Sequence, residues 1–302
     1  MFPTLSAPEV LTIHRAPDPA PGLVYAAPHA GRVYPEDMGH ARRLIELRRM
    51  EDALVDQLVA RAPQDGADLL VLNTARTSLA VNRDPSEFDE TLFSGALKAQ
   101  GIRPTRSFRV EQGLGLIPRE TEGRLIYDRK LDPAEAARRL NAVFHPYHQA
   151  LLRLLQDKSK ADGFAFLIDW HSMPSSAARA SVRPGLRGPD LVIGDRFGAS
   201  CAPALADLVA RWFEGRGFRV ARNKPFAGGY VTETYGRPAA GVHALQVELN
   251  RALYLDELQV EPNGGMERLT GVISAFTQDL ALCLRGPLRP YMKGEGRDDR
   301  HG

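Results

Sequence analysis

The stretch FAFLIDWHSMP, residues 164–174, joins a run of apolar residues to side chains that can bind metals or move protons. The run from Phe164 to Ile168 contains no polar residue, which is typical of strands covered on both faces in α/β sheets. Asp169 and His171 follow it at once. Ligands in such sheets bind beyond the carboxyl ends of the strands, so we expect the chemistry of this chain to lie there.

Other apolar runs of this kind occur along the chain, at residues 23–27, 68–72, 79–81, 191–193, 218–220 and 244–247. Between them, apolar residues at three- and four-residue spacings predict helices over residues 41–62, 202–215 and 266–284. The clearest helix begins at Asp132, because Asp-Pro-Ala-Glu supplies an N-cap, a proline at the first helical position and a capping box, and it could run past Leu155. The alternation predicts an α/β fold of three layers, a mixed and mostly parallel sheet with helices on both faces.

Length and composition indicate an ordinary globular protein. The 302 residues contain no repeat or low-complexity linker, which favours one domain over residues 1–285. Residues 286–302 are rich in glycine, proline and charge and are expected to form a flexible C-terminal tail. The net charge of +2 favours neither nucleic acid nor an anionic membrane. With no signal-like or membrane-spanning apolar segment, we expect a cytoplasmic protein.

Four of the predicted strands are followed by polar residues that could form one site. The two cysteines, Cys201 and Cys283, lie far apart outside any CxxC pair, so a bound metal would have nitrogen and oxygen ligands. Taken alone, His29 or His171 could be a loop histidine bonded to the backbone. Their joint placement after two buried runs indicates a site. The candidate residues that follow the four runs are His29, Asn82 with Arg83, Asp169 with His171, and Glu248 with Arg251.

Two histidines leave a hydrolytic zinc short of a third protein ligand, which is typically a carboxylate, with the fourth position kept for water. The candidates are Glu36, Glu51 and Asp52. Glu51 and Asp52 begin a helical stretch, so they could instead be solvated residues favoured by the helix dipole. The residues themselves leave this choice open.

Glu248 lies inside the otherwise apolar run HALQVEL, where a carboxylate is costly unless it is paired or partly protonated. Burial would raise its pKa, which suits a general base for water and a general acid for a departing amine. The structural alternative is a salt bridge to Arg251 or Arg83.

Asn82 and Arg83 offer a neutral donor beside a bidentate cation, a pairing matched to a substrate carboxylate. Alternatively, Asp84 neutralises Arg83 as a surface pair. The Gly228-Gly229 turn allows close approach of the backbone to a ligand, although it could equally be an ordinary tight turn.

The motifs PHAG, VNRDP, DWHSMP, FAGGYVTETYG and GVHALQVELNRALYLDE occur in an order that resembles the N-formylglutamate amidohydrolase family. The resemblance runs from about residue 23 to about residue 284. It implies a zinc-carboxypeptidase-like α/β fold, like that of phosphorylase/hydrolase enzymes, and a single zinc ion (Zn²⁺). On the matching positions the zinc ligands would be His29, Asp52 and His171, with Glu51 as the alternative to Asp52.

The resemblance also implies roles for the remaining residues. Glu248 would be the catalytic glutamate, and Asn82 with Arg83 would recognise a substrate carboxylate, although Val81 replaces the aspartate more usual before them. Apart from the resemblance, we hypothesise that a nearby donor such as Arg119 or Arg251 stabilises the oxyanion. The substrate-binding candidates are therefore Asn82, Arg83, Arg119, Gly229 and Arg251.

The family reaction converts N-formyl-L-glutamate to formate and L-glutamate, a terminal step in some routes of histidine breakdown. The expected partner is therefore a small-molecule N-acyl amino acid, with no nucleic acid and no membrane, and the oligomeric state is left open. The alternatives are a zinc carboxypeptidase, an acylase for another N-acyl amino acid, and a non-catalytic ligand-binding relative that has lost its metal.

Overall fold

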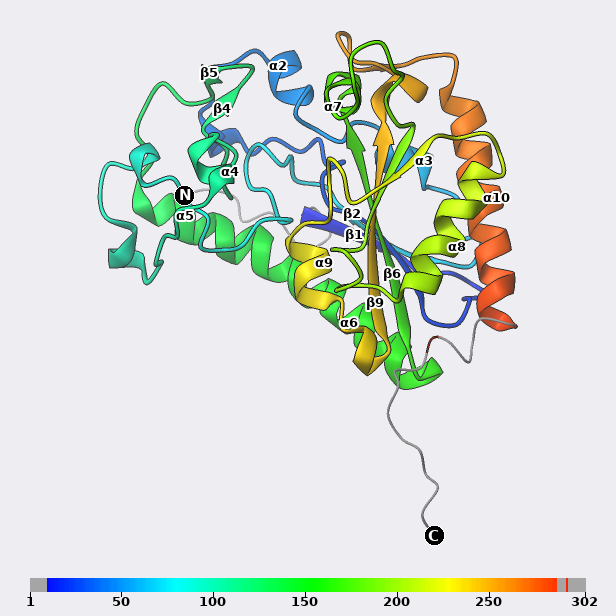
Figure 1. The fold of residues 1–302 in the computed structure, drawn as a ribbon. Helices are drawn as coiled ribbons and strands as arrows, with labels where there is room; N and C mark the ends of the chain where they lie inside the picture. Colours follow the sequence, from blue (N-terminus) through cyan, green and yellow to red (C-terminus); the bar gives the residue numbers. More distant parts are fainter. Residues whose placement is uncertain (1–9, 287–291, 293–302) are drawn as a thin grey trace.

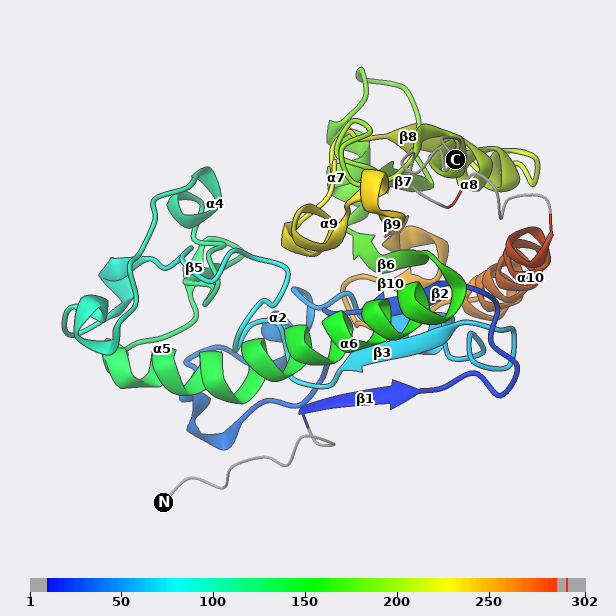
Figure 2. The same ribbon diagram turned by 90° about the horizontal axis from the view of Figure 1, so that it is seen from below.

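A computed structural model describes residues 10–286 and residue 292. Seven strands form one sheet in the order β1-β3-β2-β6-β9-β7-β8, with helices on both faces (Figures 1 and 2). The strands are β1 (Leu11–His14), β2 (Leu23–Ala27), β3 (Asp68–Leu72), β6 (Ala165–Met173), β7 (Leu191–Gly194), β8 (Val220–Arg222) and β9 (Val242–Asn250). The predicted α/β class is confirmed.

The sheet is mixed. Its central strands β3, β2, β6 and β9 are parallel to one another. The edge strand β1 runs antiparallel to β3, and β7 runs antiparallel to β9 with β8 parallel to β7. The sequence analysis missed β1, whose four residues are too short and too exposed to give a continuous apolar run.

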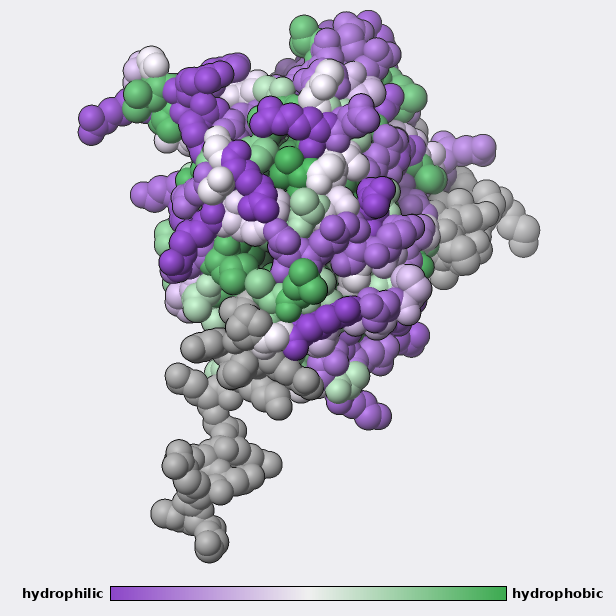
Figure 3. All heavy atoms as spheres, turned by 90° about the vertical axis from the view of Figure 1, so that its right-hand side faces the viewer, coloured by the Kyte–Doolittle hydropathy of each residue, from purple (hydrophilic) through white to green (hydrophobic). Residues whose placement is uncertain are grey.

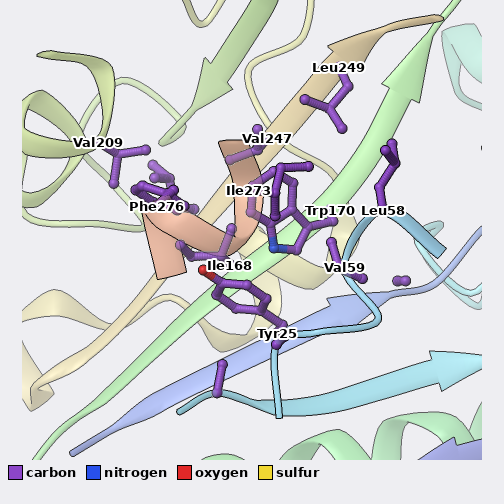
Figure 4. Packing of buried hydrophobic residues seen from close by; sticks show 14 of the residues in the cluster. Tyr25, Leu58, Val59, Ile168, Trp170, Val209, Val247, Leu249, Ile273 and Phe276 are labelled. Atoms are coloured by element: carbon purple, nitrogen blue, oxygen red, sulfur yellow. The ribbon is translucent and has the colours of Figure 1, made fainter. Parts of the chain in front are cut away.

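Alternation along β6 and β9 sends successive side chains to opposite faces of the sheet. One face carries Trp170, which belongs to a core cluster that includes residues of helices α3 (Val55–Leu58), α8 (Pro203–Glu214) and α10 (Met266–Arg285). The ring centroid of Trp170 lies 5.4 Å from that of Tyr25 and 6.2 Å from that of Phe276 (Figure 4). The side of the molecule where α8 and α10 lie is mostly hydrophilic outside, as two amphipathic helices require (Figure 3).

The other face of the sheet packs against one long helical segment. It begins at Asp132, which caps α5 (Pro133–Arg139) with the predicted capping box. A π-helical turn, Leu140–Phe144, joins α5 to α6 (His145–Asp162), and Gly163 ends the segment in the left-handed conformation with φ 82°. The predicted helix is therefore confirmed, as are those that became α8 and α10.

Several predicted boundaries were wrong. Residues 41–62 are not one helix but α2 (Leu44–Arg48) and α3, separated by a turn in which Leu54 has φ 63°. The run at residues 79–81 is a loop, because the Ala80 amide donates to the carbonyl of Leu116 instead of to a strand. The predicted strand at residues 218–220 lies at residues 220–222. Strands β6 and β9 extend beyond their apolar runs, so His171 and Glu248 lie within strands.

Residues 84–131 leave the sheet between β3 and α5, and we call them the arm (Figures 1 and 2). The arm carries η2 (Glu90–Leu92), η3 (Leu97–Gln100), α4 (Phe108–Glu111), β4 (Glu120–Thr121) and β5 (Arg124–Leu125). The remaining elements are η1 (Glu36–Met38), α7 (Ser175–Ala180), α9 (Tyr230–Tyr235), η5 (Pro238–Ala240), η6 (Arg251–Leu253), β10 (Leu255–Asp256) and β11 (Glu261–Pro262).

Within residues 10–286 there is no helix of the length and apolar character that crossing a membrane requires. The expected tail, residues 286–302, lies outside the described residues except for Gly286 and Met292. Met292 is buried, and its carbonyl oxygen lies 3.1 Å from Nε2 of His243.

Candidate active site

A cavity of about 920 Å³ opens where β6 and β9 reach their carboxyl ends. Its walls come from the sheet, the arm, and the segments that follow β2, β3, β6, β7, β8 and β9. The sequence-predicted residues that line it are His29, Asp52, Asn82, Arg83, His171, Gly229, Glu248 and Arg251. Segments that are distant in sequence therefore converge, as the positions of the apolar runs suggested.

His29, Asp52 and His171 form a compact buried cluster. Nδ1 of His171 lies 2.8 Å from Oδ2 of Asp52, and Nδ1 of His29 lies 3.5 Å from the same oxygen. One ligand atom from each residue fits within 4.8 Å of the others. The broken helix is what brings Asp52 here, since the Asp52 amide donates to the carbonyl of His29.

The donor set of this cluster fits a zinc ion. Both ring nitrogens of His29 are buried without a hydrogen-bond partner, and burial followed by the charge of Arg76 holds its pKa well below the usual range. A lowered pKa favours the neutral imidazole, the form that ligates metals. Two nitrogens and one carboxylate oxygen are a common zinc set. Glu51 lies outside the cluster, where Oε1 accepts a hydrogen bond from the Tyr34 hydroxyl.

His171 is held from behind by two polar side chains. Its Nε2 lies 2.9 Å from Oδ2 of Asp169 and 3.1 Å from Nδ2 of Asn82. Oδ1 of Asn82 accepts a hydrogen bond from the backbone amide of Val231 in the first turn of α9, so this side chain ties α9 to the cluster. Asn82, predicted to bind substrate, is thus buried against His171, although it also lines the cavity.

Gly229 lies against Asn82. A Cβ atom at position 229 would come within 2.4 Å of Asn82 Oδ1, so a side chain there would displace the asparagine. The glycine is therefore explained by this packing as well as by its place in the cavity wall.

Glu248 is placed by strand register. It pairs with His171 across β6 and β9, which puts both side chains on the same face of the sheet. Burial raises the pKa of Glu248 to about 7. Nε2 of Gln246 donates to Oε1 of Glu248 over 2.8 Å. The carboxyl group is therefore held in place and can change protonation near neutral pH.

Two arginines flank the Asp52 carboxylate on the side opposite the histidines. Nη2 of Arg251 lies 3.2 Å from Oδ1 of Asp52, and its Nε donates to the Ser172 hydroxyl over 3.0 Å. Nη1 of Arg76 lies 3.4 Å from the same carboxylate oxygen. Sequence reasoning missed Arg76. Arg76 could have been found from its position just after β3, because the other candidates were found from their positions just after apolar runs.

Arg119 is not brought to this cavity. It pairs with Asp89 and Glu120 within the arm and lines a separate pocket. Its carboxylate partners satisfy the guanidinium there, so the structure gives no support to Arg119 as an oxyanion donor.

Comparison with known sequences decides the family. A sequence model described as N-formylglutamate amidohydrolase matches residues 22–255. The chain belongs to this family. N-formylglutamate deformylase of Pseudomonas putida is 31% identical over 258 residues, 83% of this chain and 87% of its own length. The corresponding enzyme of Pseudomonas aeruginosa is 34% identical, covering 82% and 86%.

Solved structures agree. The crystal structure of N-formylglutamate amidohydrolase from Ralstonia eutropha JMP134 superposes with a TM-score of 0.87 at 33% identity, covering 92% of this chain and 99% of its own. A gene product of Agrobacterium tumefaciens, at 17% identity and a TM-score of 0.64, shares the fold alone. The predicted family is confirmed, and the protein is a hydrolase acting on an amide bond.

Proposed function

We propose that this amidohydrolase is zinc-dependent and converts N-formyl-L-glutamate to formate and L-glutamate. The observation that carries the proposal is the buried cluster of His29, Asp52 and His171 beside Glu248, on one face of the sheet. The names of its Pseudomonas and Ralstonia relatives support the substrate. We further infer that the reaction serves histidine breakdown, as the family resemblance implies.

His29, Asp52 and His171 would hold the zinc ion, and Asp169 and Asn82 would keep the His171 ring in position. When bound, zinc supplies Lewis acidity, which polarises a carbonyl group and acidifies water. All three ligands are buried, and His171 is tightly paired with Asp52, so the site would hold its geometry without reorganisation when substrate binds.

Glu248 would carry the proton. In its ionised form it takes a proton from the attacking water as oxygen bonds to the formyl carbon. The protonated Glu248 then delivers the proton to the amide nitrogen as the carbon–nitrogen bond breaks, releasing L-glutamate and formate. A pKa of about 7 suits both steps near neutrality.

Arg251 and Arg76 would stabilise the oxygen that gains negative charge during attack, because both guanidinium groups line the cavity beside Asp52. Arg83 would bind a substrate carboxylate, because it lines the cavity and has no carboxylate within ion-pair distance among the described residues. Asn82 would support the site from behind.

The test combines metal analysis with a substrate panel. The purified protein should contain about one zinc per chain. It should lose activity on chelation and regain it with added zinc. N-formyl-L-glutamate should be hydrolysed faster than N-acetyl- or N-succinyl-glutamate or dipeptides.

Three results would contradict the proposal. Full activity after complete metal removal would refute the zinc requirement. Faster turnover of an acetyl substrate or a dipeptide would identify an acylase or a carboxypeptidase. Metal-free protein that is inactive on the whole panel, even with added zinc, would identify a non-catalytic relative.

A further inference from the structure

The arginines that line the cavity differ in whether a carboxylate neutralises them. They are Arg49, Arg76, Arg83, Arg109, Arg196 and Arg251. Four have a carboxylate oxygen within ion-pair distance: Glu122 at 3.3 Å from Arg49, Asp52 at 3.4 Å from Arg76 and 3.2 Å from Arg251, and Glu233 at 2.9 Å from Arg196. Within the described part of the chain, Arg83 and Arg109 have none.

Arg83 and Arg109 are connected through the backbone of the arm. Nε of Arg83 donates to the carbonyl of Leu114 over 3.2 Å, and Nη1 donates to its neighbour Asn82 over 3.0 Å. The amide of Leu114 donates in turn to the carbonyl of Arg109 over 2.8 Å, which closes the turn after α4. The segment that carries Arg109 is therefore fixed against the Arg83 side chain.

The positive charges are ordered from the metal cluster toward the arm. Arg76 forms an ion pair with Asp52. Among the neighbouring charges, those of Asp52, Arg251 and Glu248 act most strongly on the pKa of Arg76. Burial, and after it the charges of Arg76 and Arg109, lower the pKa of Arg83 to about 9, although the charges of Glu87 and Glu248 oppose the shift. Like charges left unneutralised repel, so an anion between Arg83 and Arg109 would be stabilised.

We propose that Arg109 binds the side-chain carboxylate of the substrate and so sets selectivity for an acidic amino acid. This inference rests on the proposed function, in which the substrate has two carboxylates. The α-carboxylate lies one carbon from the scissile amide nitrogen and meets Arg83. The side-chain carboxylate lies two methylene groups further out and reaches Arg109 on the arm.

N-formyl-L-glutamine is the matched probe, because it keeps the shape of N-formyl-L-glutamate and lacks the second charge. The Arg109→Ala variant should lower kcat/KM for N-formyl-L-glutamate about 10- to 100-fold, mainly through KM, because a charge-assisted contact is lost. Activity on N-formyl-L-glutamine should change less than about twofold. The Arg109→Lys variant should restore part of the loss, because it keeps the charge without the planar fork.

Arg106 is the matched control. It lies three residues earlier in the arm, pairs with Glu111 at 3.0 Å and does not line the cavity. The Arg106→Ala variant should have the same kcat/KM as the wild type on both substrates. An equal loss on both substrates in the Arg109→Ala variant, or no loss on either, would overturn the assignment.

Binding of glutarate, a simple dicarboxylate, separates this inference from the proposed function. Calorimetry should show weaker glutarate binding to the Arg109→Ala variant than to the wild type, and no difference for butyrate. If wild-type protein does not hydrolyse N-formyl-L-glutamate but shows this difference, the proposed function fails and the subsite stands. If it hydrolyses N-formyl-L-glutamate and glutarate binding is unaffected by the substitution, the subsite is refuted.

Discussion

The cavity has a sheet wall, formed by β6, β9 and Arg251, and an arm wall, formed by Arg83 and the arm, and the two are built differently. On the sheet wall, His171 contacts two carboxylates, Glu248 accepts from Gln246, and Arg251 is fixed by Asp52. On the arm wall, Arg83 contacts only backbone carbonyls, and neither it nor Arg109 has a carboxylate partner among the described residues. Under the proposed function, the groups that hold one geometry during the reaction have protein partners, apart from His29. The groups proposed to bind a charged ligand have no carboxylate partner.

The largest effect should come from the sheet wall. The Glu248→Gln variant should retain zinc and lose about two to four orders of magnitude in kcat, because glutamine cannot move the proton. Kinetics on N-formyl-L-glutamate together with metal analysis measure both quantities. Full activity in this variant would remove Glu248 from the mechanism.

Glu51 provides the control for that substitution. It is also buried, and burial raises its pKa to about 7, but its carboxylate faces Tyr34 and not the cavity. The Glu51→Gln variant keeps a hydrogen-bond acceptor for Tyr34 and should retain the rate within a fewfold. A loss as large as that of Glu248→Gln would show that burial of an acid, and not its position, decides the effect.

A smaller effect should follow from loosening the support of His171. The Asp169→Asn variant should weaken zinc affinity about 10- to 100-fold, because the hydrogen bond that orients the ring is weakened. Competition with a chelator of known affinity measures this. Asp65 is a buried aspartate bonded to Ser274 and Gln278 on the other face, and Asp65→Asn should leave the affinity unchanged. Equal affinities in wild type and Asp169→Asn would refute the support role.

Sequence reasoning predicted the parts of the molecule that depend on local pattern. The apolar runs predicted β2 and β3 at their observed bounds, and the capping box at Asp132 predicted the start of α5. His29, His171 and Glu248 were recognised because each polar side chain interrupts or follows an apolar run. These signals are readable in a few consecutive residues, so no knowledge of the tertiary fold was needed.

The rest depends on contacts between distant segments. The break that places Asp52 at the cluster requires the left-handed backbone of Leu54, and leucine gives no signal for that conformation. Arg119 was expected at the site, but its partner Asp89 lies 30 residues away in the sequence and holds it in the arm. Arg109 was missed because its importance comes from what it lacks, a carboxylate partner, and only the assembled cavity shows this.

The arm wall needs its own anchor, and His148 of α6 supplies one. Its Nε2 lies 2.9 Å from the carbonyl oxygen of Val81, directly before Asn82, and its Nδ1 lies 2.9 Å from the hydroxyl of Tyr235 in α9. Burial lowers the pKa of His148 to about 4, although the Val81 contact opposes the shift, and the charge of His145 also acts to lower it. The folded protein therefore keeps this imidazole neutral.

This neutral histidine should make stability depend on pH. The unfolded chain has a histidine pKa of about 6.5, so below that pH it binds a proton that the folded state rejects, and stability falls as the pH falls toward 4. From pH 6.5 to 5 the loss should be about 1.5 kcal/mol. Denaturant unfolding of the wild type and the His148→Gln variant should show their difference in free energy of unfolding shrinking by that amount. A constant difference for His148→Gln would mean that this histidine takes up its proton at the same pH in the folded and the unfolded protein.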